Sequence, residues 1–300
     1  MNFIVLVVKG QQYKKAISIS SQNDAYLLGK QDRYYTNGLF FQFDTKVDSK
    51  KSFHKATRWE LGQMIFTAFS GAVPLLIKQD RPFAGYLFIK KTNTYFFTTK
   101  KMLGVSLTAG VLGPSSYAKE TVTLIHRVFN LYKPDGWQHQ IPNEVAIGSG
   151  GVYTWLLKEN ENADIALEHT ANLSNVFSNA GTAVVFRAGK FDKGLLNTRF
   201  FNPVITGKAN NGECFLYLKI KGQYILYDAT IQGRLFHKGE QEYFDKEPFI
   251  ASVEPGLFLS KNRLSVNCFA MISSRQVKNS KYAKQQYGSI TLSYHFPRKN

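Results

Sequence analysis

Residues 289–296 read Ser289-Ile290-Thr291-Leu292-Ser293-Tyr294-His295-Phe296 and alternate strictly between polar and apolar side chains. A period of two is the pattern of a β-strand with one polar and one apolar face. In a soluble sandwich the apolar face would pack on a core. In an outer-membrane barrel it would face lipid, and the polar face would line the lumen. This strand therefore limits the fold to one of two all-β architectures.

The aromatic content favours the barrel. The 300 residues include 16 Tyr and 24 Phe, often near the ends of predicted strands. Outer-membrane barrels place aromatic side chains in girdles at both membrane interfaces. A last strand that closes on Phe296, close to the end of the sequence, agrees with this arrangement.

Similar segments recur along the sequence and dominate it. They are Ser18 to Leu28, Gly38 to Asp44, Trp59 to Thr67, Gly85 to Thr98, Leu103 to Leu112, Val145 to Leu157, Ile165 to Leu173, Thr182 to Ala188, Cys214 to Ile220, Tyr224 to Thr230, Phe258 to Leu264 and Val266 to Ser274. With the last strand they predict a transmembrane antiparallel β-barrel of about twelve strands, with a short helix in an outer loop. We expect one domain over residues 16–300. Residues 1–15 are interpreted as a signal remnant or a disordered N-terminus, because the apolar run is shorter than the ~7–15 residues of a complete signal.

The net charge of +17 predicts attraction to a polyanion, either nucleic acid or an anionic lipid surface. Lys and Arg are scattered, and no recognition helix or basic stripe appears, so nucleic acid is disfavoured. A solvated basic surface without a specific partner stays open as an alternative. Cys214 and Cys268 are too few for a disulfide scaffold and are interpreted as packing residues. No stretch reaches the ~18 apolar residues of a transmembrane helix.

One segment breaks the strand pattern. From Tyr117 to Tyr132, Val122, Ile125, Phe129 and Tyr132 recur at helical spacing, which predicts a short amphipathic helix. His126 falls on the border of this apolar stripe, so it should face whatever the helix packs on.

A strand count from a periplasmic N-terminus places the outer loops near residues 29–33, 69–82 and 114–143. Asp24, Thr36, Arg81 and His126 should then share the cell-exterior rim. An imidazole is the side chain best suited to move a proton near neutral pH, so His126 is the candidate general base. The alternative is a helix-border histidine that only bonds its neighbour, and His139 is the closest competitor.

Asn23 and Asp24 offer hard oxygen atoms of the kind that calcium prefers, and Thr36 could add a hydroxyl. The alternative is that Asn23 and Asp24 simply turn the chain. Asn37-Gly38 has the composition of a turn or bulge, where backbone amides could approach an oxyanion.

The serine motif Gly-x-Ser-x-Gly does not occur, so water activated by a base is favoured over a serine nucleophile. The guanidinium of Arg81 could hold a phosphate, and Lys78 is a second candidate chosen by its charge. An Asp80–Arg81 pair that pins the loop is the structural alternative.

A set of short motifs carries a resemblance to a known family. They are Gln22-Asn23-Asp24, Asp32-Arg33-Tyr34-Tyr35-Thr36-Asn37-Gly38, Leu61-Gly62-Gln63, Asp80-Arg81-Pro82-Phe83-Ala84-Gly85, Gly113-Pro114-Ser115, His126-Arg127 and Gly136-Trp137-x-x-Gln140-x-x-Asn143-Glu144. In this order, over roughly the first half of the chain, they resemble the outer-membrane lipid A deacylase family. The second half agrees in strand character only.

The resemblance implies an outer-membrane barrel that hydrolyses a 3'-linked acyl ester of lipid A with calcium. It further implies a site between the outer barrel wall and a loop helix. Carried over by motif, His126 is the general base on a water, Asp24 is a calcium ligand or charge partner, and Asn23 and Thr36 support the metal and the oxyanion. No family motif places the contacts to the lipid phosphates, so Arg81 and Lys78 are candidates for these contacts from their chemistry alone. We expect a membrane-embedded monomer in the Gram-negative outer membrane that acts on lipopolysaccharide. The rivals are a non-enzymatic barrel, either a pore or a structural protein, and an outer-membrane phospholipase.

Overall fold

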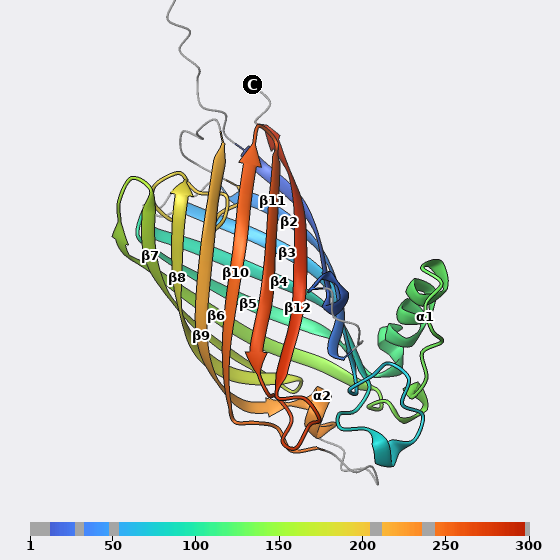
Figure 1. The fold of residues 1–300 in the computed structure, drawn as a ribbon. Coiled ribbons are helices and arrows are strands. Elements are labelled where there is room, and N and C mark those ends of the chain that lie inside the picture. The colour runs from blue at the N-terminus through green and yellow to red at the C-terminus, as the bar shows by residue number, and fades with distance from the viewer. Residues whose placement is uncertain (1–12, 28–32, 48–53, 205–211, 236–243, 298–300) are drawn as a thin grey trace, which may run out of the picture.

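The computed structural model describes residues 13–27, 33–47, 54–204, 212–235 and 244–297. The chain forms twelve strands that run up and down in sequence order and close into a barrel through pairing of the first strand with the last (Figure 1). Every pair of neighbouring strands is antiparallel. The prediction of an antiparallel barrel of about twelve strands, with a short helix in an outer loop, is confirmed.

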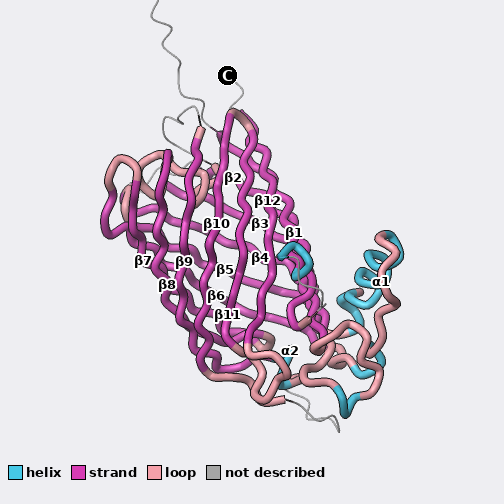
Figure 2. The backbone as a smooth tube through the Cα atoms, in the orientation of Figure 1, coloured by secondary structure: helices cyan, strands magenta, loops and turns pink. Residues whose placement is uncertain are grey.

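The strands are β1 (Tyr13–Asn23), β2 (Tyr34–Val47), β3 (His54–Thr67), β4 (Ala84–Thr98), β5 (Lys101–Leu112), β6 (Glu144–Glu159), β7 (Ala163–Ser174), β8 (Phe177–Lys190), β9 (Glu213–Asp228), β10 (Phe249–Lys261), β11 (Leu264–Ser274) and β12 (Lys284–Pro297). The helices are α1 (Ala118–Val128) and α2 (Ala229–Gln232). Short 3-10 turns are η1 (Asp24–Leu27), η2 (Leu76–Lys78), η3 (Pro114–Ser116) and η4 (Trp137–His139). Figure 2 shows how little of the described chain is helical.

None of these helices has the length and hydropathy needed to cross a bilayer.

Three boundaries differ from the sequence-based expectation. The segments Cys214 to Ile220 and Tyr224 to Thr230 form one strand, β9, because the residues between them stay paired with β8 and β10. The predicted segment Phe258 to Leu264 crosses the turn between β10 and β11. The first strand, predicted from Ser18 to Leu28, instead begins at Tyr13 and stops at Asn23, where the chain bends into η1. Residues 1–12 and most of the first predicted outer loop lie outside the described residues.

The strands have two faces of opposite character. Ile17 and Ile19 of β1 are exposed on the outer wall, whereas Ser18 and Ser20 face inward and are buried. The Ser18 hydroxyl bonds that of Ser293 at 2.8 Å across the β1–β12 closure. In a barrel surrounded by lipid, apolar side chains face outward and polar side chains face inward. This pattern fixes which residues of each strand reach the membrane side.

Side chains fill the barrel at two levels. At the end of the barrel that carries α1, the outer end, an aromatic layer contains Tyr35, Phe66, Tyr86, Phe88 and Phe177. Toward the inner end a second cluster joins residues of β9, β10 and β11 to the segment that follows β8, and its members include Phe191, Phe200, Phe215, Tyr217 and Phe258. Leu195 and Val204 of that segment are also completely buried. The interior is thus a packed core with polar gaps.

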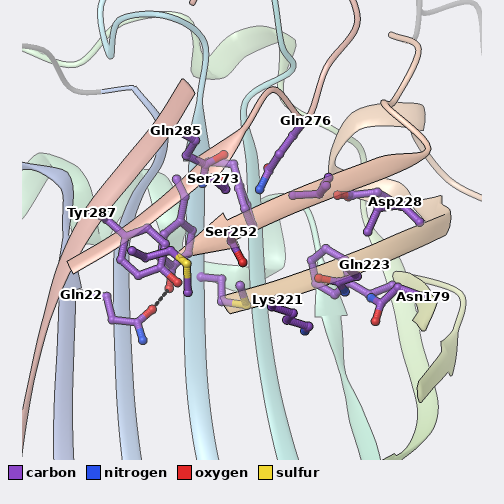
Figure 3. Close-up of a pocket in the computed structure, with 17 residues that line it drawn as sticks. Gln22, Asn179, Lys221, Gln223, Asp228, Ser252, Ser273, Gln276, Gln285 and Tyr287 are labelled. Carbon is purple, nitrogen blue, oxygen red and sulfur yellow. Dashed lines mark hydrogen bonds between the residues drawn. The ribbon is translucent and has the colours of Figure 1, made fainter. Parts of the chain in front are cut away.

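One of these gaps is a cavity of about 280 Å³ inside the barrel, near the end that carries α1 (Figure 3). Gln22, Lys221, Gln223 and Gln285 are among the side chains around it, and Gln22 accepts a hydrogen bond of 2.5 Å from the Tyr35 hydroxyl. All these residues project into the lumen. The cavity is therefore separated by the barrel wall from any site that faces the membrane.

Candidate active site

The strand directions bring the predicted residues to one rim, called the outer rim below. β1 ends at Asn23, immediately before Asp24, and β2 returns from this rim at Tyr34. Arg81 lies in the next loop of the same rim, between β3 and β4, and His126 lies in α1, between β5 and β6. The topology thus gives the four residues the common rim that the sequence predicted.

Asn23 and Asn37 face the membrane side of the barrel. They are paired across β1 and β2, on the face that carries the exposed side chains Ile19 and Phe41. Asn23 Nδ2 donates to Asn37 Oδ1 at 2.6 Å, and the Asn23 Oδ1 accepts from the Ala25 amide at 2.6 Å. Asn37 is nevertheless buried. Two amide side chains that bond each other on a lipid-facing wall, one of them buried, are the first indication of a functional site there.

Asp24 begins η1, the turn that folds back over the outer wall beside β1 and β12 (Figure 2). Its side chain is buried, and Asp24 Oδ2 accepts a hydrogen bond of 2.7 Å from the Arg33 amide. Gly288 of β12 permits this close approach, since a Cβ there would lie 2.7 Å from the Tyr26 Cβ. The buried carboxylate is thereby fixed at the edge of the wall that carries Asn23.

Thr36 occupies a β-bulge. Tyr35 pairs with Phe66 and Asn37 pairs with Ile65, so Thr36 is the extra residue of β2. Bulges re-aim side chains and are common beside active sites. Thr36 is buried, and its hydroxyl lies 3.4 Å from the Ile65 carbonyl oxygen, a long hydrogen bond. The expected bulge at Asn37-Gly38 is thus present one residue earlier, and Asn37-Gly38 itself lies within the strand.

Helix α1 packs against the outer wall of β3 and β4. Gln63 Nε2 donates to the Ser116 carbonyl at 2.7 Å, just before the helix starts. Gly85 of β4 lets the helix approach, since a Cβ there would lie 2.1 Å from Ser116 Oγ and 2.3 Å from Ala118 Cβ. Figure 1 shows α1 standing beside the barrel as part of the long outer loop.

The face that α1 buries differs from the predicted stripe. Ala118, Val122 and His126 are the buried residues of the helix, spaced by four. The helix ends at Val128, whereas Phe129 and Tyr132, assigned to the stripe from the sequence, are exposed. Tyr117 has a left-handed conformation with φ 57°, so the chain turns sharply just before the helix begins at Ala118. His126 consequently lies on the buried face and not at its border.

A small apolar core connects the helix to the bulge. Ile65 packs in one cluster with Ala118, Val122, Phe83 and Trp137. Ile65 is also the residue opposite Asn37, and its carbonyl faces Thr36. Because His126 follows Val122 by one turn on the same helix face, it lies about 6 Å further along α1. The chain of contacts from Asn23 to Ile65 and on to α1 places Asn23, Thr36 and the helix that carries His126 on the same side of the barrel, which makes this wall the candidate site.

The structure fixes the orientation of the His126 ring. His126 Nδ1 lies 2.7 Å from the Tyr132 carbonyl oxygen, and the two rings meet edge to face with centroids 4.6 Å apart. A carbonyl oxygen can only accept, so Nδ1 carries the hydrogen and Nε2 carries the lone pair of the neutral ring. This is the tautomer in which Nε2 can accept a proton.

The oxygen atoms near Asp24 match calcium in type. Calcium takes six to eight hard oxygen ligands, and Asp24, Asn23 and Thr36 supply a carboxylate, an amide oxygen and a hydroxyl. Within the described ranges, no three His, Cys, Asp or Glu side chains gather around one point. A calcium site built here would therefore depend on one carboxylate together with backbone carbonyls, water and substrate.

Arg81 lies apart from this patch. Its side chain is completely buried, with Nη2 donating to Thr230 Oγ1 at 2.7 Å and Nη1 donating to Gln276 Oε1 at 3.1 Å. The guanidinium also stacks 4.5 Å above the ring of Phe66, which belongs to the aromatic layer inside the barrel near the outer rim. Burial lowers the pKa of Arg81 from its ordinary value, and the nearby carboxylates of Asp228 and Asp80 oppose that shift. These contacts favour a structural role over the predicted phosphate contact.

Asp80 pins the loop, but through other partners than Arg81. Its carboxylate accepts from the Tyr34 hydroxyl at 2.6 Å, from the Phe69 amide at 2.8 Å and from the Lys281 amide at 2.9 Å. Asp80 thus ties three outer loops together. Lys78, the other predicted substrate contact, is exposed at the tip of η2. Lys78 therefore remains accessible to a ligand in a way that Arg81 does not.

A family model for "Outer membrane protein LpxR" matches residues 1–296. The chain belongs to the LpxR family. This confirms the resemblance to the lipid A deacylase family and the outer-membrane location expected from the sequence. Among solved structures, LpxR from Salmonella typhimurium superposes with a TM-score of 0.76 at 17% identity, covering 94% of this chain and 100% of that one. At this identity the match shows a shared LpxR barrel fold.

A structure with lower similarity is the β-domain of the Bordetella autotransporter BrkA, with a TM-score of 0.44 at 9% identity, covering 96% of this chain and 100% of that one. Comparison with curated protein sequences gives no match.

Three supporting residues of the candidate site were not identified from the sequence. Asn37 holds Asn23, Gln63 holds the start of α1, and the Tyr132 carbonyl orients His126. Strict alternation from Ile17 through Ile19 to Asn23 was a signal that could have placed Asn23 on the membrane side. No sequence signal identifies the Tyr132 carbonyl, because that contact depends on how the chain turns after α1.

Proposed function

We propose that this protein is an outer-membrane lipid A 3'-O-deacylase, which hydrolyses the 3'-linked acyl ester of lipid A with calcium and with His126 as general base. One observation carries the proposal. His126, on the wall-facing side of α1, donates from Nδ1 to the Tyr132 carbonyl, so Nε2 is the nitrogen that can take a proton. Membership of the LpxR family supports the substrate.

In the proposed reaction, His126 Nε2 takes a proton from water as the water oxygen bonds to the ester carbonyl carbon. The bond to the 3'-oxygen then breaks, and that oxygen receives the proton held by His126. The products are a fatty acid and a free 3'-hydroxyl. One amide hydrogen of Asn23 Nδ2 is used by Asn37, so the second is suited to stabilise the oxyanion. Asp24 and Thr36 would hold calcium, which when bound polarises the ester carbonyl.

The packed interior supports an enzyme over a pore. Aromatic layers fill the barrel near both ends, and the candidate residues lie on its outer wall. The phospholipase alternative uses the same chemistry on another ester. Mass spectrometry of lipid A and phospholipids, from cells with and without the protein, separates the alternatives. Loss of a 3'-acyl chain from lipid A alone supports the proposal, whereas lysophospholipid or an ion current without acyl release contradicts it.

Replacing His126 by alanine should lower kcat by about 10²- to 10⁴-fold, the contribution typical of a general base. The measurement is fatty-acid release from purified lipid A. His139→Ala in the same outer loop is the matched control and should keep near-wild-type activity. Equal activity of His126→Ala and wild type, with the barrel folded, would rule out His126 as the base.

Asp24→Asn tests the calcium role. The amide oxygen of asparagine can still accept from the Arg33 amide, while the negative charge is lost. We expect calcium to raise the melting temperature of the wild type and to have at most a small effect on Asp24→Asn, as measured by thermal unfolding in detergent with calcium or EGTA. An equal calcium response in both proteins would show that the ion binds elsewhere.

A further inference from the structure

A trough crosses the membrane-facing wall on the side of η1 away from α1. It has a volume of about 560 Å³ and is lined by β9, β10, β11 and β12 together with Tyr26 and Leu27 of η1. Its volume lies within the ~300–1,000 Å³ typical of ligand pockets. The candidate active site uses the wall of β1 to β4, so the trough is a separate feature.

Small side chains form the floor of the trough. Pro255, Ala270 and Gly288 lie in one row across three neighbouring strands, on the lipid-facing side of each. The next outward-facing row toward the inner end contains Leu216, Leu257, Cys268 and Ile290, which pair across the four strands. The row toward the outer rim contains Ile220, Val253, Ile272 and Gln286, which also pair in order. The floor is therefore low because its side chains are short.

The dimensions of the trough fit a hydrocarbon chain. The two larger rows are four residues apart along the strands, or about 13 Å between backbones, and their side chains narrow the space between them. An α-helix with its side chains is about 10–12 Å wide, so it would lie on top of the two larger rows and would not reach the floor between them. A single acyl chain can enter. Across these three strands the floor is about 10 Å long, and Leu218 of β9 continues the row at its far end.

The end of the trough lies at the turn that carries Asp24. Tyr26 covers Gly288, and its hydroxyl is held 2.8 Å from Ser21 Oγ. Asp24 and Leu27 are the first and last residues of η1, so they are about 6 Å apart along its axis. A chain that fills the trough would therefore end within one turn of the buried carboxylate.

We propose that this trough binds an acyl chain of the lipid whose ester is cleaved, with η1 as its end wall. The inference rests on the proposed function, which supplies the ester. The trough would then determine which length of acyl chain the enzyme prefers. An acyl chain lying over Pro255, Ala270 and Gly288 is removed from the other lipids and positioned beside η1.

The two cysteines provide a matched test. Cys268 lines the trough, whereas Cys214 lies on the same lipid-facing wall outside it. Cys268→Phe should fill part of the trough, and Cys214→Phe should add the same side chain where it blocks nothing. With lipid A carrying 3'-linked chains of different length, Cys268→Phe should lower kcat/KM for the longest chain by about tenfold, the loss expected when roughly two methylene groups are no longer buried. The shortest chain should be affected less than twofold, and Cys214→Phe should match the wild type.

Thiol labelling of the folded wild type separates this inference from the proposed function. Added long-chain fatty acid should protect Cys268, but not Cys214, from a maleimide in detergent solution. Equal labelling of both thiols would overturn the trough as a chain site. Protection of Cys268 together with an unchanged chain-length profile in Cys268→Phe would show a bystander lipid and also overturn the proposal. A wild type that releases no fatty acid would refute the deacylase function, and the labelling result would then decide the trough alone.

Discussion

At the scale of single residues, two buried side chains from neighbouring outer loops have different roles. His126 is buried against the outer wall and is oriented by the Tyr132 carbonyl. Arg81 is buried toward the lumen, where Thr230, Gln276 and Phe66 surround its guanidinium. A buried guanidinium that donates to Thr230 and Gln276 inside the fold contributes to stability, whereas a site for substrate needs access.

Arg81→Met tests this distinction. Methionine keeps much of the apolar volume but removes the hydrogen bonds to Thr230 and Gln276, so the free energy of unfolding should fall by about 2–3 kcal/mol. KM for lipid A should stay within twofold of the wild type. The measurements are urea unfolding and steady-state hydrolysis. A large rise in KM without loss of stability would restore Arg81 as a substrate contact.

At the scale of elements, much could be predicted from periodicity. Alternation identified the strands, and the strand count placed Asp24, Thr36 and His126 at one rim. The local sequence pattern was insufficient where strand pairing decides the structure. In β9, Lys221, Gly222 and Gln223 lay outside both predicted segments but are paired within one continuous strand. The pattern also failed for α1, because the face that a helix buries depends on the turn at Tyr117 and on the wall that receives it.

The seating of α1 should depend on Gly85. Gly85→Ala adds a methyl group where Ser116 and Ala118 already lie, so the start of α1 must shift and activity should fall at least tenfold. Gly222→Ala is the control, since nothing lies within 4 Å of its added Cβ. The measurements are fatty-acid release and the rate of limited proteolysis in the outer loop. Equal behaviour of the two variants would show that α1 does not depend on this contact.

At the scale of the whole molecule, the inner end of the barrel is stabilised by a buried ion pair. Arg187 and Asp164 are both fully buried, and Arg187 lies 4.4 Å from the ring of Phe191 and 4.9 Å from that of Phe201. Arg187 Nη1 also donates to Thr198 at 3.0 Å, within the segment that follows β8. This cluster anchors that segment inside the barrel and was not foreseen, because the partners are distant in sequence.

Arg187→Met should lower the free energy of unfolding by about 3–5 kcal/mol, because it leaves the Asp164 carboxylate buried without its counter-ion. The double variant Arg187→Met/Asp164→Leu should recover much of that loss. Urea unfolding in lipid vesicles measures both. A single variant as stable as the wild type would mean that the pair contributes nothing to the closed inner end.

The outward direction of Asn23 and Asn37 has a kinetic consequence. A substrate that meets the enzyme from the side never has to leave its leaflet, so encounters occur by lateral diffusion in two dimensions. Turnover should then follow the mole fraction of lipid A in the bilayer and not its amount per volume of buffer. Diluting the lipid within the vesicle would slow the enzyme, while diluting the vesicles in water would leave the rate per enzyme molecule unchanged.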